Sequence, residues 1–207
     1  MTKIKLCGLM HEEDARAANE AHPDWVGLVF DEGRHFVSDD KAAAIRRALS
    51  PAIPAVGVFV RDDPAHIETL VSSGIIQYVQ LHGGESEDYI RKLKKVISVP
   101  VIRVVSVRTK EDVLIAAQTE AEYLLLDHGK GGTGKSFDWS MIPSIKKPWF
   151  MAGGIGLSNI RKALSYHPYA VDISSGAETD GHKDPIKMKQ LVDIVRAYPE
   201  SNEGRWL

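Results

Sequence analysis

The sequence predicts an α/β protein built as a single closed (β/α)8 barrel, the TIM-barrel fold. Eight short apolar runs, rich in Val, Ile, Leu and aromatic residues, recur at fairly even spacing, and each is short enough to be a strand. Helical patterns follow most of them, an alternation typical of parallel strands covered by helices. The chain of 207 residues allows about 26 residues per unit, which is compact for this fold. An open, doubly wound sheet is the structural alternative.

The expected elements follow directly from these runs. We expect strands over residues 4–7, 25–30, 55–60, 76–81, 99–104, 123–127, 149–152 and 170–174. We expect helices over residues 39–49, 64–73, 85–96, 109–119, 158–165 and 185–198, the first capped by Ser38 and the second opened by Asp63 and Pro64. No linker rich in Pro, Gly or Ser divides the chain, so we expect one domain over residues 1–207, with residues 200–207 as a loose tail.

Composition excludes several classes of function. The net charge is −2 and 43% of the residues are hydrophobic, so a sizeable core is expected and nothing indicates a nucleic-acid partner. Cys7 is the single cysteine, which precludes an internal disulfide and favours a reducing compartment. The N-terminal residues carry no apolar leader, and no run is long enough to span a bilayer. We therefore expect a cytoplasmic protein with no membrane partner.

A glycine-rich loop follows the sixth predicted strand. The run ending at Asp127 leads into residues 128–139, and residues 129–136 match the nucleotide-binding P-loop pattern. A P-loop requires a long helix directly after it, but Pro143 and Pro148 leave room for only about one turn. The sequence therefore favours a loop that holds a sugar phosphate, and a P-loop remains the minor interpretation.

In a (β/α)8 barrel the chemistry lies at the carboxyl ends of the strands. Those ends are occupied by Cys7, Phe30, His82, Arg103, Asp127, the Gly153-Gly154 pair and the Ser174-Ser175-Gly176 run. They are the residues from which an active site would be built.

Two of these residues could do acid–base chemistry. Alternation along the first strand turns Lys3, Lys5 and Cys7 toward the barrel interior, where the nearby Lys5 could lower the pKa of the thiol. Cys7 could equally be a small buried hydrophobic residue. Asp127 shares a strand face with Leu125, and it could either act as an acid or cap the loop that follows.

The other strand ends suggest binding. His82 is followed by two glycines and could either bind substrate or hold its loop by hydrogen bonds. Small, glycine-bearing loops follow the seventh and eighth strands, where this fold usually binds phosphate. Their residues are Gly153, Gly154, Ser174, Ser175 and Gly176. The alternative for both loops is an ordinary tight turn.

Taken together, these residues and their order resemble the phosphoribosylanthranilate isomerase family. The matching segments run in order and cover almost the whole chain. They are Lys5-Leu6-Cys7-Gly8-Leu9, Val26-Gly27-Leu28-Val29-Phe30, Val56-Gly57-Val58-Phe59-Val60, Val79-Gln80-Leu81-His82-Gly83, Leu125-Leu126-Asp127, Gly131-Gly132-Thr133-Gly134-Lys135-Ser136-Phe137-Asp138-Trp139, Ala152-Gly153-Gly154-Ile155 and Val171-Asp172-Ile173-Ser174-Ser175-Gly176-Ala177-Glu178.

One loop departs from the family pattern. After the second strand the family usually shows Ser-Pro-Arg or Ser-Lys-Arg, then an aromatic residue or His, and then Val-Ser. Residues 31–38 of this chain lack the Ser-Pro, and one extra residue lies between Arg34 and Val37-Ser38. The resemblance implies that an arginine here binds the anthranilate carboxylate. Arg34 is the expected residue, and Arg103 at the end of the fifth strand is the alternative.

The resemblance also implies the reaction. N-(5-phosphoribosyl)anthranilate would undergo an Amadori rearrangement, with Asp127 as general acid and Cys7 as general base, and with neither a metal nor another cofactor. His82, Gly132 and the two glycine-bearing loops would bind the sugar phosphate. We expect a monomer or a homodimer. The rivals are the related isomerase of histidine biosynthesis, which uses two aspartates, a P-loop protein, and a barrel that only binds a sugar phosphate.

Overall fold

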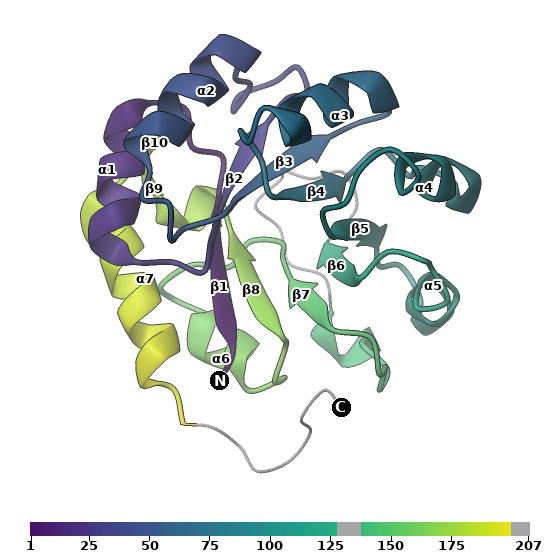
Figure 1. Cartoon of the computed structure of the whole chain (residues 1–207). Helices are drawn as coiled ribbons and strands as arrows, with labels where there is room; N and C mark the ends of the chain where they lie inside the picture. Colours follow the sequence, from purple (N-terminus) through teal and green to yellow (C-terminus); the bar gives the residue numbers. More distant parts are fainter. Residues whose placement is uncertain (128–137, 200–207) are drawn as a thin grey trace.

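The computed structural model describes residues 1–127 and 138–199. Within them, eight parallel strands close into a barrel in the order β1 to β8, with β8 hydrogen-bonded back to β1 (Figure 1). Helices surround the strands on the outside (Figure 1). The predicted closed barrel is confirmed, and the open sheet is wrong.

The strands and helices lie close to their expected positions. The barrel strands are β1 Lys3–Cys7, β2 Trp25–Val29, β3 Ala55–Phe59, β4 Tyr78–Leu81, β5 Val101–Ser106, β6 Tyr123–Asp127, β7 Trp149–Met151 and β8 Ala170–Ile173. The helices are α1 Glu12–Ala21, α2 Asp39–Ala48, α3 Pro64–Ser72, α4 Glu87–Leu93, α5 Lys110–Ala116, α6 Ile160–Leu164 and α7 Pro185–Ala197, with the 3-10 turns η1 Trp139–Met141 and η2 Ser175–Ala177. The predicted caps are present, because Ser38 Oγ accepts from Lys41 N and Asp63 Oδ1 accepts from Ala65 N.

Two features were not predicted. Helix α1 has no large apolar side chain, and it buries small residues such as Ala15, Ala18 and Ala21 where it packs against α2 and α7. The antiparallel pair β9 Glu178–Thr179 and β10 His182–Lys183 interrupts the connection between β8 and α7. Each of its strands is two residues long, too short to leave a periodic pattern in the sequence.

The structure does not describe the glycines of the loop predicted after β6. Residues 128–137, which include Gly132 and the whole of the P-loop match, lie outside the described residues, as does the expected tail 200–207. Between residue 138 and β7, the described chain forms one three-residue 3-10 turn, η1. The long helix required by a nucleotide-binding P-loop does not follow, so that interpretation is wrong.

The two ends of the barrel interior are filled differently. Aromatic side chains fill the end at which the strands begin, where Trp25 contacts Tyr78, Phe150 and Tyr169. The Lys3 ammonium lies over the rings of Trp25 and Tyr169. Aromatic rings thus occupy this end, and a cavity lies at the opposite end of the strands. No helix within residues 1–127 and 138–199 is long and apolar enough to cross a membrane.

Candidate active site

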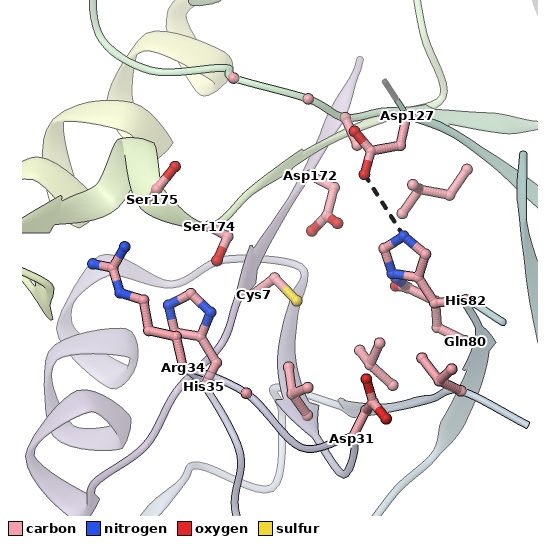
Figure 2. A pocket seen from close by; sticks show the side chains of 18 of the residues that line it. Cys7, Asp31, Arg34, His35, Gln80, His82, Asp127, Asp172, Ser174 and Ser175 are labelled. Carbon is pink, nitrogen blue, oxygen red and sulfur yellow. Dashed lines mark ion pairs between the residues drawn. The ribbon is translucent and has the colours of Figure 1, made fainter. Parts of the chain in front are cut away.

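A cavity of about 640 Å³ opens at the carboxyl ends of the barrel strands (Figure 2). Its volume suits a small organic ligand. It brings together eight of the residues expected from the sequence: Cys7, Arg34, His82, Asp127, Gly153, Gly154, Ser174 and Ser175. The carboxyl ends of parallel strands meet at one end of the barrel, so residues far apart in the chain converge here.

Cys7 reaches the cavity from the end of β1 and is buried. A glycine on the neighbouring strand gives its sulfur room, because a Cβ placed on Gly27 would lie 2.5 Å from Cys7 Sγ. Gly27 and Cys7 are directly paired in the β1–β2 register. A side chain at position 27 would therefore push the thiol out of place.

A buried ion pair lies beside the thiol. Lys5 is fully buried, as alternation predicted, and its Nζ donates to Asp172 Oδ1 at 2.9 Å. Burial raises the pKa of the Cys7 thiol, the charge of Lys5 opposes that rise, and the charge of Asp172 adds to it. The expected fall in the thiol pKa is therefore wrong for the unliganded site, because desolvation outweighs the nearby cation. Asp172 was not among the expected site residues.

Asp127 ends β6 on the other side of the cavity, with His82 beside it (Figure 2). His82 Nε2 lies 3.7 Å from Asp127 Oδ2, which is longer than a hydrogen bond. Among the described residues, this nitrogen is buried and makes no hydrogen bond. A buried polar atom without a partner is costly, so the imidazole is available to a ligand.

Gln80 is a site residue that the sequence analysis left out. It precedes His82 by two positions and shares its strand face, which is the signal that could have identified it. Its side chain lines the cavity at 2% exposure, and its Oε1 has no hydrogen-bond donor among the described residues. A ligand hydroxyl or amine would satisfy this oxygen.

The loop after β7 has the geometry expected for binding an anion. Gly153 and Gly154 both adopt positive φ, 89° and 64°, a conformation that favours glycine. Asn159 holds the loop, donating from Nδ2 to Gly154 O and accepting from Gly156 N. Within the described residues the N–H groups of Gly153 and Gly154 make no hydrogen bond, and backbone N–H groups in such a loop can bind an anion.

Gly176 differs from its neighbours Ser174 and Ser175, because it does not line the cavity. A Cβ at this position would lie 2.0 Å from the carbonyl oxygen of Ile155 and 2.8 Å from Gly156 Cα. Gly176 therefore allows the loops after β7 and β8 to pack closely, which is a structural contribution to the site.

The two candidate arginines are placed very differently. Arg34 lines the cavity, together with its neighbour His35. Arg103 is absent from the lining, and its guanidinium is paired with Glu87 at the start of α4. Arg34 is thus the arginine that can reach a ligand carboxylate. Among the described residues, no three His, Cys, Asp or Glu side chains gather where they could hold a metal ion.

Comparisons with known proteins point to one family of isomerases. The family model of N-(5'phosphoribosyl)anthranilate (PRA) isomerase matches residues 4–194. A relative from Endomicrobium trichonymphae, N-(5'-phosphoribosyl)anthranilate isomerase, is 42% identical over 95% of this chain and 100% of its own. Monomers generated from the dimeric enzyme of Thermotoga maritima share the structure with a TM-score of 0.82 at 31% identity, covering 96% of this chain and 100% of that one.

Another similar solved structure contains a bound ligand. It is a phosphoribosylanthranilate isomerase in complex with reduced 1-(o-carboxyphenylamino)-1-deoxyribulose 5-phosphate, with a TM-score of 0.79 at 30% identity over 96% of this chain and 100% of that one. The matches extend over nearly the full length of both partners. This chain belongs to the N-(5'-phosphoribosyl)anthranilate isomerase family.

Proposed function

We propose that this chain converts N-(5-phosphoribosyl)anthranilate to 1-(2-carboxyphenylamino)-1-deoxyribulose 5-phosphate, a step of tryptophan biosynthesis. The observation that carries the proposal is the placement of Cys7 and Asp127. One ends β1 and the other ends β6, and both face a single cavity (Figure 2). A thiol and a carboxyl group on different sides of a small ligand suit a reaction that needs one base and one acid.

The rearrangement begins with two proton transfers and ends with a tautomerisation that places a proton on C1 and removes one from the C2 hydroxyl. Asp127, in its protonated form, gives its proton to the furanose oxygen as the C1–O bond breaks, leaving a protonated Schiff base between C1 and the anthranilate nitrogen. Cys7, as thiolate, removes the proton from C2, and the electron pair of that C–H bond forms the enolamine. The enolamine then tautomerises to the aminoketone. No electron enters or leaves the substrate, so the chemistry requires no redox cofactor.

The raised pKa of the Cys7 thiol fits this order of events. In the unliganded site, burial holds the proton on sulfur. The protonated Schiff base is a cation formed beside Cys7, and a nearby positive charge favours the thiolate. The base would thus become active after ring opening, which is the step at which it is needed.

Binding contacts divide between the two ends of the substrate. The phosphate would contact the free N–H groups of Gly153 and Gly154 and the loop of Ser174 and Ser175, with Gly132 as a further expected contact. The anthranilate carboxylate would pair with Arg34. The unpaired atoms of His82 and Gln80 would bind the ribose hydroxyls.

The partner of this protein is therefore a small sugar phosphate. We expect the enzyme to act as a monomer or a homodimer, in the cytoplasm. Complementation of a tryptophan auxotroph lacking only this step, together with kinetics on the purified protein, tests the function. Turnover of the histidine-pathway ribonucleotide, with no turnover of N-(5-phosphoribosyl)anthranilate, would reject the proposal in favour of the related isomerase.

Replacement of Cys7 tests the base. Cys7→Ser keeps a similar size but substitutes a hydroxyl that stays protonated, and we expect kcat to fall by about 100-fold or more. Affinity for the reduced product, measured by titration, should change little, because the thiol acts on C2 and not on the phosphate. Near-normal kcat in Cys7→Ser would show that another group is the base.

Asp127→Asn tests the acid. The amide keeps the shape of the side chain but has no acidic proton, so kcat should fall by about 100-fold or more while the reduced product still binds. Asp88→Asn is the matched control, because Asp88 is an exposed carboxylate, 62% accessible, on α4. If binding disappears together with activity in Asp127→Asn, the residue serves binding or folding instead.

The pKa of the Cys7 thiol can be measured directly, because the chain has one cysteine. Alkylation by iodoacetamide requires the thiolate, so its rate should rise with pH along a curve centred above the ordinary value of about 8.5. A midpoint below the ordinary value in the unliganded protein would contradict the effect of burial.

Gly154→Val tests the phosphate site. The new side chain would crowd the anion at a backbone N–H that is free in the structure, and we expect KM to rise by about tenfold or more. Gly74→Val controls for backbone strain, because Gly74 has a similar φ of 73° with open space around it. Equal KM values for the two variants would place the phosphate elsewhere.

A further inference from the structure

We propose that Glu178, the first residue of β9, is a positioning residue that fixes Arg34 and His35 at the rim of the cavity. The inference rests on the proposed function, because Arg34 is the residue expected to bind the substrate carboxylate. Neither the acid–base chemistry nor the phosphate site uses Glu178. It lies in the short antiparallel pair after β8, and it is absent from the cavity lining.

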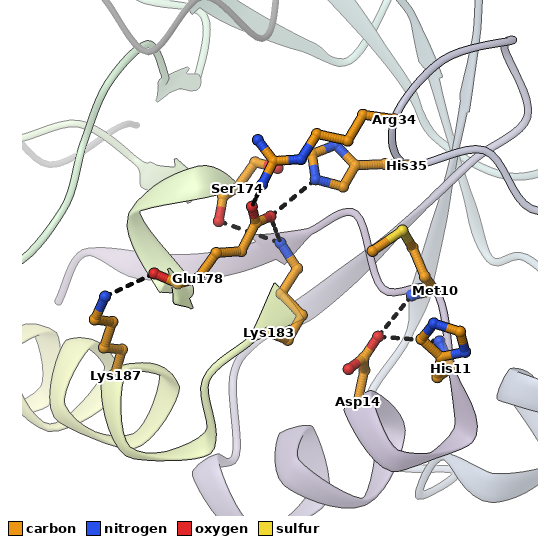
Figure 3. Close-up of polar contacts among 9 residues, drawn as sticks. All are labelled: Met10, His11, Asp14, Arg34, His35, Ser174, Glu178, Lys183 and Lys187. Atoms are coloured by element: carbon orange, nitrogen blue, oxygen red, sulfur yellow. Dashed lines mark hydrogen bonds and ion pairs between the residues drawn. The ribbon is translucent and has the colours of Figure 1, made fainter. Parts of the chain in front are cut away.

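Three side chains converge on the Glu178 carboxylate (Figure 3). Arg34 Nη2 donates to Oε2 at 2.7 Å. His35 Nε2 lies 2.8 Å from Oε1, and Lys183 Nζ donates to the same oxygen at 2.6 Å. The Glu178 side chain is only 3% exposed, so these partners replace its water shell. Both carboxylate oxygens are engaged, and two of the three partners come from the loop after β2.

Contacts of its backbone with β10 and α7 fix the position of Glu178. Its backbone pairs with Lys183 in the β9–β10 register, and its carbonyl oxygen accepts from Lys187 Nζ at 2.6 Å. Lys183 Nζ also donates to the carbonyl oxygen of Ser174 at 3.2 Å. These contacts tie Glu178 to α7 and to the loop after β8. Glu178 is therefore the fixed partner, and the loop that carries Arg34 is the one that depends on it.

The loop after β2 is held at its end by the bridge between Val29 and Phe36, whereas the Arg34 side chain depends on Glu178. Residues 31–35 form bends and turns, and the Arg34 side chain is 55% exposed. An exposed arginine samples many rotamers, but one ion pair to a planar guanidinium fixes the plane of the group. Among the described residues Glu178 is the only ion-pair partner of Arg34. The pair occupies Nη2, and the Nε and Nη1 donors remain available to a ligand carboxylate.

His35 gains a defined tautomer from the same carboxylate. Burial and the charge of Lys183 lower the pKa of the His35 imidazole, although Glu178 opposes this, so the ring is neutral near pH 7. A carboxylate accepts hydrogen bonds only, so the ring proton lies on Nε2 and Nδ1 is left as an acceptor. His35 also packs over Gly8, where a Cβ would lie 3.0 Å from the ring. Glu178 thereby sets two neighbouring lining residues at once.

The test is a double-mutant cycle on KM and kcat. Glu178→Gln keeps the volume of the side chain but removes its charge, and we expect KM to rise by about tenfold while kcat stays within about threefold. In an Arg34→Met background the same change should alter KM by less than about twofold, because Arg34, the contact of Glu178 that is expected to bind the substrate carboxylate, is gone. A purely structural role would give the same effect in both backgrounds.

A control variant and the wild-type protein distinguish failure of this inference from failure of the proposed function. Glu120→Gln removes an exposed carboxylate that pairs with Arg91 at 3.1 Å far from the cavity, and it should leave both constants unchanged. Wild-type KM in Glu178→Gln, or effects that multiply in the double variant, would overturn the inference while the proposed function stands. Absence of turnover in the wild-type protein would overturn both.

A second variant covers the case in which Glu178→Gln does not fold. A Cβ at Gly181, in the turn between β9 and β10, would lie 3.0 Å from Arg34 Nη2. Gly181→Ala therefore shifts the guanidinium by a few tenths of an ångström, and because Gly181 has a φ of 85°, it also strains the turn between β9 and β10. It should raise KM in the wild-type background and not in the Arg34→Met background. A wild-type KM in Gly181→Ala would overturn the inference.

Discussion

The ion pair between Lys5 and Asp172 is the interaction on which the rest of the site depends. These residues face each other in the register of β1 and β8, the two strands that close the barrel. A fully buried ammonium without a counter-charge would be very costly, so a slip of this register would leave Lys5 unpaired. The pair thus ties barrel closure to the position of Cys7, which lies two residues further along β1 on the same face.

The main features of the fold could be predicted because strand pattern and strand order determine them. Apolar runs marked the strands, and alternation correctly turned Lys5 inward. Helix α1 was missed because its buried face consists of alanines, which carry little signal in a polar helix. The β9–β10 pair was missed because each of its strands is two residues long, and strands so short leave no periodicity in the sequence.

The candidate site, like the fold, has features that the sequence could predict and features that it could not. Residues at strand ends, such as Cys7, His82 and Asp127, could be predicted to face one cavity, because all parallel strands end on the same side of the barrel. The pKa direction of Cys7 could not, because it depends on how far burial outweighs Lys5 and on the charge of Asp172. The alternation that identified His82 also applies to Gln80, but its unpaired amide oxygen is visible only in three dimensions.

Strands and loops contribute to the site in different ways. The residues proposed for proton transfer lie on β1 and β6, whose backbones are fixed by hydrogen bonds on both sides. The residue proposed for carboxylate binding, Arg34, lies in the loop after β2, where residues 31–35 form bends and turns. A fixed anchor outside such a loop can hold its side chains over the cavity. Glu178 has this property, because its backbone is held by β10 and α7 and its carboxylate accepts from Arg34. A binding residue in a loop can therefore be positioned by a neighbouring loop, while the residues for proton transfer are positioned by the strands.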